Sequence, residues 1–221
     1  MIRLLVEEST KTGITVQDLD FGKTKNWTSE SKISSPFEGA ELKKKDKNET
    51  KTQTDIILGD FQINYGKSAE AKPETYPKNL GIIEAKMGSG LSTGIKNATE
   101  YNQASRSICC LAHATKESPE CEIFFAIVAP EIILNNPKSK IKQQIEKIET
   151  EIENRFVETD VPYTDEMKNK VKNCKKLIIT FEEWINKIED NDVKKELNDF
   201  YGKCIDYNIN RRLTKGKFIG K

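Results

Sequence analysis

Histidine is almost missing from this sequence, with His113 the only one among 221 residues. Metal centres built on several histidines are therefore excluded. HNH-type nuclease chemistry and Ser-His-Asp catalysis also lose support, since both need a histidine at the reacting centre. His113 falls near the predicted end of a helix, where we expect a structural or capping role.

Several other features that would define a protein class are also missing. No apolar run approaches the ~20 residues that a membrane-spanning helix needs. Residues 1–8 lack the longer apolar core and the cleavage site of a signal peptide. The five cysteines are odd in number and form no C-x-x-C pair, so we expect buried thiols, not a disulfide framework or a zinc finger. The resulting expectation is a cytoplasmic protein with no membrane partner.

Charge is abundant but nearly balanced, with 32% charged residues and a formal net charge of +1. The basic residues gather in residues 43–51 and 211–221, whereas acids concentrate in residues 146–166 and 182–192. Such separation could steer a polyanion such as DNA onto one face of the protein. The alternative is that both basic runs are solvated loops or chain ends.

Short apolar runs alternate along the chain with stretches of helical periodicity. The predicted strands are residues 54–58, 61–65, 80–86, 122–129 and 176–180. The predicted helices run from residue 92 or 93 to about 114, over 141–156 and 181–188, and from 192 to about 201. This alternation predicts the α/β class, with a mixed central β-sheet flanked by helices.

The connections and the domain limits are predicted from the same patterns. Residues 61–65 are expected to form the second arm of a hairpin, and residues 66–79, with two prolines, to form a loop. With no repeat or low-complexity linker, one domain over 1–221 is the simplest division, with its core at about 51–190. Residues 1–50 and 191–221 are then peripheral.

One Glu-x-Lys tripeptide stands out from the others. The pattern begins six times, at Glu30, Glu41, Glu49, Glu70, Glu84 and Glu166. Only Glu84 and Lys86 lie at the end of an apolar strand, and residues two apart on a strand share a face. Charged groups at the end of a buried strand need a partner or a cleft, because burying them unpaired costs several kcal/mol.

Asp55 supplies such a partner, because it opens a second apolar run that we expect beside the Glu84 strand. The two carboxylates and the backbone carbonyl of Ala85 suit Mg²⁺, and Mn²⁺ should be able to substitute for it. Lys86 could orient or deprotonate a water, or neutralise charge in the transition state. The alternative is a structural ion pair of Lys86 with Asp55 or Glu84. Asp60, after a predicted turn, is the second candidate for the metal ligand.

The run TDIIL followed by GIIEAK resembles the PD-(D/E)xK, or restriction-endonuclease-like, nuclease superfamily. The resemblance covers about residues 51–130, with KLIITFEEW plausibly inside the same fold. It implies catalytic roles for Asp55, Glu84 and Lys86, metal binding by the two acids, and a restriction-endonuclease-like core. It also implies a role near the site for Gln103 on the following helix. Thr54 stands before Asp55 where the superfamily's pattern has proline.

Two further kinds of residue follow from the resemblance and the predicted helices. Many superfamily members carry an acid on an upstream helix, for which Glu38 and Glu41 are the candidates. Lys96 and Arg106 are candidate DNA contacts through phosphate, although ordinary exposed helix charge would explain them equally well. The helix predicted over 141–156 is expected to pack on the core, and the alternative is a homodimer surface.

The resemblance implies a Mg²⁺-dependent endonuclease that hydrolyses DNA, with restriction or phage defence as the expected biology. Repair or recombination is the next expectation. A competing hypothesis is a non-catalytic nucleic-acid-binding or interaction module on the same fold.

Overall fold

The computed structural model describes residues 1–38, 51–66, 69–88, 90–92, 94 and 101–210. A five-stranded sheet at its centre has the order β11-β10-β9-β6-β3. The strands are β3 Asn26–Ser29, β6 Ile56–Gly59, β9 Asn79–Ala85, β10 Glu122–Ala129 and β11 Lys175–Thr180. β9, β10 and β11 are parallel, whereas β6 and β3 run antiparallel to their neighbours. The predicted mixed α/β class is therefore confirmed.

Two smaller sheets accompany the central one. The first has the order β5-β4-β8-β7, and the second is the pair β1-β2. Their strands are β1 Thr15–Val16, β2 Leu19–Asp20, β4 Lys32–Ile33, β5 Thr52–Gln53, β7 Phe61–Tyr65 and β8 Ala69–Pro73.

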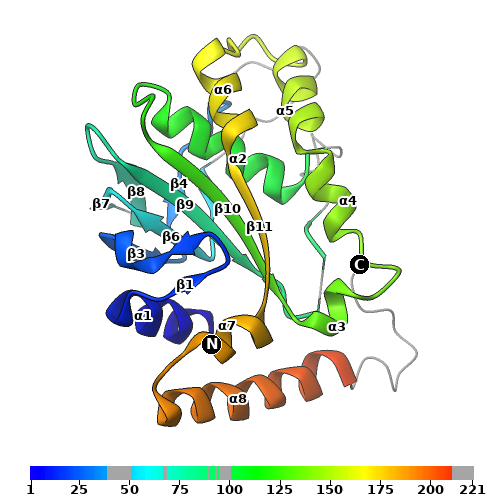
Figure 1. Cartoon of the computed structure of the whole chain (residues 1–221). Coiled ribbons are helices and arrows are strands. Elements are labelled where there is room, and N and C mark those ends of the chain that lie inside the picture. Colours follow the sequence, from blue (N-terminus) through cyan, green and yellow to red (C-terminus); the bar gives the residue numbers. More distant parts are fainter. Residues whose placement is uncertain (39–50, 67–68, 89, 93, 95–100, 211–221) are drawn as a thin grey trace.

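Helices cover both faces of the central sheet (Figure 1). The elements are α1 Ile2–Thr12, η1 Phe21–Lys23, α2 Gln103–Thr115, α3 Glu131–Leu134, α4 Ile141–Glu146, α5 Ile148–Val157, α6 Asp165–Asn173, α7 Phe181–Lys187, α8 Asn191–Ile205 and the π-helical turn η2 Asp206–Asn210. One apolar core joins the sheet to α2, α4, α5 and α6, and a second joins it to α1, α7 and α8. Alternate side chains of the strands point into the two cores, with Ile57 and Ile82 in the first and Ile56 and Ile83 in the second.

The predicted hairpin between residues 54–58 and 61–65 is wrong. β6 pairs with β9 and β7 pairs with β8, so β6 and β7 are successive parts of one arm of a long, bent ribbon. At the bend Gly59 has φ +124°, and a Cβ there would lie 2.3 Å from the Asn79 carbonyl oxygen. Only glycine fits both constraints. The predicted loop over 66–79 is likewise wrong, because it contains β8.

Asp60, the second candidate for the metal ligand, lies at this bend and is engaged in hydrogen bonds there. Its carboxylate Oδ2 accepts a hydrogen bond of 2.7 Å from the Lys78 backbone N–H. Its own N–H donates to the Asn79 carbonyl at 2.9 Å, and its carbonyl accepts from the Glu74 N–H at 3.1 Å. Asp60 therefore fixes the crossing of the two ribbon arms.

The helices differ from the predictions in several places. α2 begins at Gln103, not at residue 92 or 93, because the Asn102 side chain accepts from the Ala104 and Ser105 N–H groups and caps it. The helix predicted over 141–156 is two helices that meet at Lys147. α6 was not predicted, although Thr164 caps its first turn.

The predicted peripheral position of residues 1–50 is wrong for the part that the structure describes. β3 is an edge strand of the central sheet, and Leu5 and Val6 of α1 are completely buried in the second core. α8 lies along the outside of the same layer and buries Leu197. No helix among the described residues is long and apolar enough to cross a membrane.

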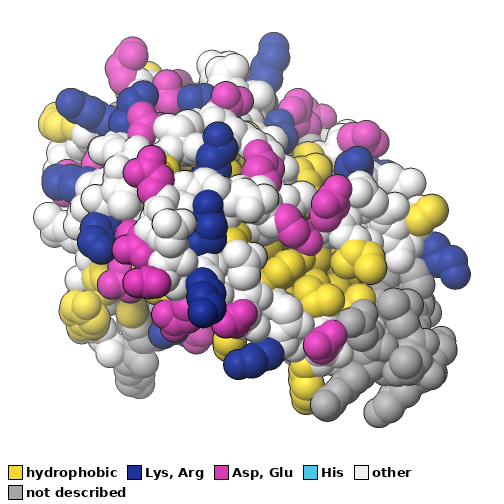
Figure 2. Space-filling model, turned by 60° about the horizontal axis from the view of Figure 1, so that its bottom comes forward, with side chains coloured by type: hydrophobic (Ala, Val, Ile, Leu, Met, Phe, Trp, Pro, Cys, Tyr) yellow, Lys and Arg dark blue, Asp and Glu magenta, His cyan; other side chains and the backbone are white. Residues whose placement is uncertain are grey.

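The surface around α8 carries charges of both signs. Figure 2 shows acidic and basic side chains interspersed over this face, with an apolar area beside the residues that are not described. The two predicted basic clusters fall mainly on residues 43–50 and 211–221, outside the described residues. Lys51, which is described, pairs with Glu70 at 2.6 Å.

Candidate active site

The register of two antiparallel strands brings Asp55 and Glu84 together. Ile56 of β6 lies opposite Ile83 of β9, so one step along the ladder sets Asp55 opposite Glu84. Both residues then share the face of Ile57 and Ile82, on which α2 packs. Asp55 Oδ2 accepts a hydrogen bond of 2.8 Å from the Ala85 N–H. The predicted adjacency of the two strands is confirmed.

Lys86 and Gln103 complete a hydrogen-bonded group around Glu84. Glu84 Oε2 accepts a hydrogen bond of 2.7 Å from Gln103 Nε2 and lies 3.5 Å from Lys86 Nζ. Lys86 Nζ in turn donates to Gln103 Oε1 at 2.8 Å. Gln103 therefore contacts both charged groups through the two ends of its amide. The four residues predicted for the catalytic centre lie in one place.

Glu84 has an unusual environment for a carboxyl group. It is 0% exposed, and its Oε1 accepts no hydrogen bond from the described part of the chain. Burial and then the charge of the neighbouring Asp55 raise the pKa of Glu84 to about 8, although Lys86 acts in the opposite direction. At neutral pH the carboxyl is mostly protonated unless another cation joins the pair.

The first turn of α2, which carries Gln103, is fixed by a neighbouring helix. Glu151 of α5 accepts hydrogen bonds from the Asn102 N–H at 2.9 Å and from Ser105 Oγ at 2.6 Å. A carboxylate beside the first N–H groups of a helix is also favoured by the helix dipole. Glu151 thus positions the helix end from which Gln103 reaches Glu84. This role could not be predicted from the sequence, because only the packing of α5 on α2 distinguishes Glu151 from the nearby acids.

Of the other predicted site residues, Glu38 and Arg106 are described, and no contact of either with this group is found. Glu38 is exposed, and its charge acts on Lys51 instead. Among the described residues, no group of three or more His, Cys, Asp or Glu side chains could hold a metal. Glu41 and Lys96 lie outside the described residues. Arg106 lies one turn further along α2 than Gln103.

His113 and the cysteines were predicted to have structural roles, and most of these side chains are at least partly buried. His113 is half-buried near the end of α2, and burial lowers its pKa. Four of the five cysteines are buried: Cys109, Cys110, Cys121 and Cys174.

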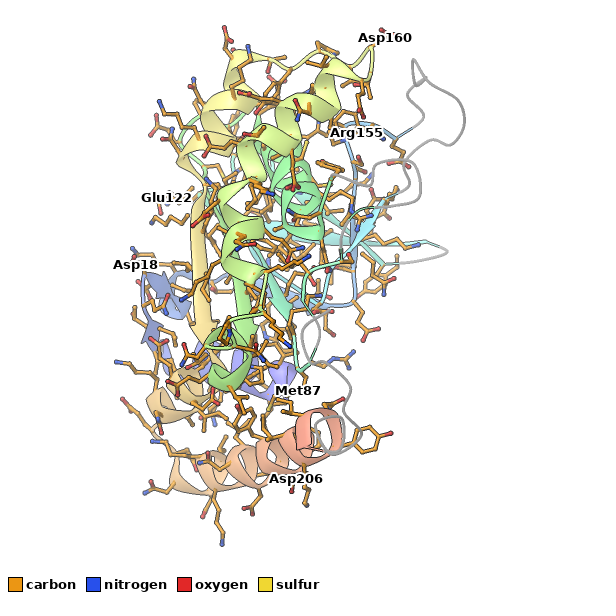
Figure 3. The ribbon with its side chains drawn as sticks, turned by 90° about the vertical axis from the view of Figure 1, so that its right-hand side faces the viewer. Asp18, Met87, Glu122, Arg155, Asp160 and Asp206 are labelled. Atoms are coloured by element: carbon orange, nitrogen blue, oxygen red, sulfur yellow. The ribbon has the colours of Figure 1, made fainter. Side chains whose placement is uncertain are left out.

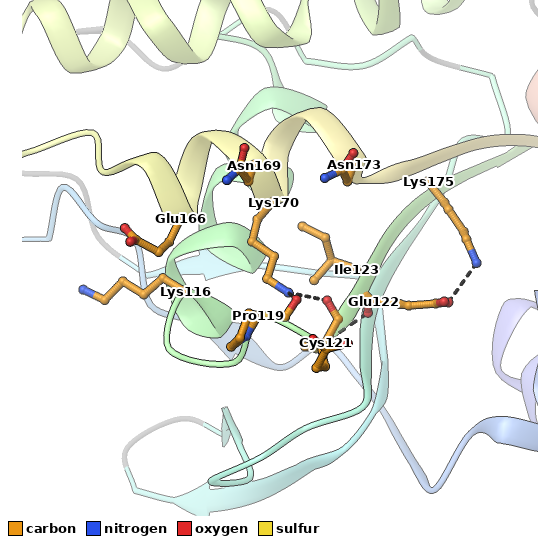
Figure 4. A pocket seen from close by; sticks show the side chains of 11 residues that line it. Lys116, Pro119, Cys121, Glu122, Ile123, Glu166, Asn169, Lys170, Asn173 and Lys175 are labelled. Atoms are coloured by element: carbon orange, nitrogen blue, oxygen red, sulfur yellow. Dashed lines mark hydrogen bonds and ion pairs between the residues drawn. The ribbon is translucent and has the colours of Figure 1, made fainter.

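A hollow of about 710 Å³ lies at the far end of the sheet, where β10 begins (Figure 4). Two of the lysines that line it are already engaged. Lys170 Nζ donates to the Pro119 carbonyl at 2.9 Å and to the Cys121 carbonyl, and Lys175 Nζ pairs with Glu122 at 2.8 Å. Glu122 opens β10, whereas Ile127, near its other end, is the register partner of Glu84. The hollow is thus separate from the site.

Comparisons with known proteins found no relative of this chain. No model of a protein family matches the chain, and no curated protein or solved structure is found to match it.

Proposed function

We propose that this protein is a Mg²⁺-dependent nuclease that hydrolyses phosphodiester bonds in DNA, on a restriction-endonuclease-like core. The observation that carries the proposal is the pair of Asp55 and the buried Glu84, opposite each other on adjacent strands, with Lys86 beside Glu84. We further propose that it acts as an endonuclease and that its biological role is restriction or phage defence.

The pair fits a hard divalent cation better than it fits a structural role. A structural pair would match one acid with one base, but here Glu84 has a second carboxylate, that of Asp55, beside it as well as Lys86. Glu84 Oε1 is buried without a donor, which is costly for a carboxylate and natural for a metal ligand. Mg²⁺ binds one or two carboxylates and keeps several waters, so two acids suffice.

Each residue has a role that follows from its position. Asp55 and Glu84 would hold the ion, with the backbone carbonyl of Ala85 as a further candidate ligand. When bound, Mg²⁺ supplies charge stabilisation for the phosphate oxygens. Lys86 would orient or deprotonate the attacking water, or offset the charge that builds on the phosphate. Gln103 holds the Lys86 ammonium at 2.8 Å and so fixes its direction.

A cleavage assay tests the proposal. Purified protein is incubated with plasmid and linear DNA in Mg²⁺, in Mn²⁺ and in EDTA, beside Glu84→Ala and Lys86→Ala variants. We expect cleavage that requires the metal and is lost in both variants. Exposed Glu153→Ala on α5 serves as a matched control and should cleave normally. Binding without cleavage would instead identify a non-catalytic nucleic-acid-binding module, and cleavage that survives Glu84→Ala would exclude this site.

A further inference from the structure

Arg106 lies on the side of α2 that faces the strands of the site. Helical spacing places Gln103, Arg106 and Cys110 along one side of the helix. Gln103 contacts Glu84, and Cys110 Sγ lies 3.4 Å from Thr52 Oγ1 of β5. Arg106 therefore sits between these two contacts, ~4.5 Å along the helix axis from Gln103.

The Arg106 side chain is only partly exposed, yet its guanidinium is unused within the described structure. Its Nε is buried and has no hydrogen-bond partner, and no ion pair joins it to a described acid. The adjacent Ser107 Oγ is also buried without a partner. A buried donor without an acceptor costs free energy unless a water or a ligand completes it.

Arg155 shows how the same side chain looks when its role is structural (Figure 3). It is buried on α5, lies 3.6 Å from Glu158, and places its guanidinium carbon 5.2 Å from the centre of the Phe37 ring. Arg106 has no comparable ion pair or aromatic contact among the described residues. This lack of an ion pair and a ring contact, and not the buried donor alone, indicates that Arg106 binds a partner from outside the chain.

We propose that Arg106 binds a backbone phosphate of the nucleic acid next to the bond that is cut. This inference rests on the proposed nuclease function. The guanidinium fork matches two phosphate oxygens, and such charge-assisted pairs are short and strong. The buried Nε would be satisfied by this anion. Arg106 is thus a substrate-positioning residue and not a metal ligand.

Binding of a fluorescent duplex oligonucleotide in Ca²⁺, which replaces Mg²⁺ to suppress cleavage, tests the assignment. Arg106→Gln should weaken binding at least about tenfold and reduce the slope of log Kd against log salt by about 0.9. Arg106→Lys should restore the salt slope but not the full affinity, because lysine lacks the fork. The control is Arg3→Gln, an exposed arginine of α1 that lies 3.7 Å from Glu30, and it should bind as wild type.

Thermal unfolding separates this role from a structural one. Arg106→Gln should leave the melting temperature unchanged or raise it, whereas Arg155→Gln should lower it. Wild-type affinity in Arg106→Gln, in a protein that cleaves DNA, would overturn the Arg106 assignment and leave the nuclease proposal standing. A wild-type protein that neither binds nor cleaves DNA would overturn both.

Discussion

Replacing Glu84 by glutamine should make the metal-free protein more stable at alkaline pH, and the effect should vanish in acid. The pKa of Glu84 is raised from 4.5 to about 8 in the folded protein. A carboxyl with a raised folded pKa stabilises the fold fully below its unfolded pKa, and this stability is lost as the pH rises through the folded pKa. Glutamine keeps the shape of the protonated carboxyl but cannot ionise.

The size of the effect follows from the two pKa values. Each pKa unit corresponds to ~1.4 kcal/mol, which sets a ceiling of about 5 kcal/mol across this interval. Relaxation and water entry around a buried charge reduce that ceiling, so we expect about 2–5 kcal/mol. The free energy of unfolding of Glu84→Gln minus that of wild type should grow by this amount between pH 4.5 and pH 8.

Urea titrations in EDTA at pH 5, 6, 7 and 8 measure this difference, with fluorescence of the buried Trp184 as the signal. Glu153→Gln, at an exposed position of α5, is the control and should show no such trend. Added Mg²⁺ should recover stability at pH 8 in wild type only, because it binds the folded ionised pair. A difference that is the same at pH 5 and pH 8 would refute the reasoning, since Glu84 would then ionise normally.

Three further predictions concern the frame around the site. Asp60→Asn should lower the free energy of unfolding, measured in urea, by about 1–2 kcal/mol, because Asp60 Oδ2 accepts a hydrogen bond from the Lys78 N–H. DNA cleavage should persist in this variant, and its loss would indicate that Asp60 is a metal ligand. Glu151→Gln should lower the free energy of unfolding by a similar ~1–2 kcal/mol and should slow DNA cleavage, because the first turn of α2 is held less firmly. An unchanged cleavage rate would contradict this. Gly81→Ala should lower the melting temperature, because its Cβ would meet Phe124 Cζ at 2.1 Å; wild-type melting would contradict that clash.

The sheet and the acidic pair could be predicted because they depend on local pattern. Apolar runs beginning at Asp55 and ending at Lys86 define two strands, and the two-residue period fixes which side chains share a face. Gln103 could be placed near the site only through the resemblance to a nuclease superfamily. Its contact with Glu84 depends on the residue at which α2 begins, and the Asn102 cap fixes that residue.

Other parts of the molecule depend on contacts distant in sequence. The sequence predicts only that a strand ends at Gly59. The need for glycine there comes from the Asn79 carbonyl, which lies close to it on the other arm of the ribbon. Glu151 is one of many acids in its segment until α5 packs on α2. From the sequence, Arg106 is equally a candidate DNA contact and ordinary helix charge, and only the structure shows its buried Nε and its lack of an ion pair among the described residues.

The central claim is that Asp55 and Glu84 together hold one divalent cation. Titration of Mn²⁺ into metal-free protein at pH 8.5, followed by the electron paramagnetic resonance of free Mn²⁺, measures this directly. We expect one site per chain, weakened at least tenfold in Asp55→Asn and in Glu84→Gln, and tighter at pH 8.5 than at pH 6.5 because the ligands must be deprotonated. Equal Mn²⁺ binding by wild type and both variants would contradict the claim.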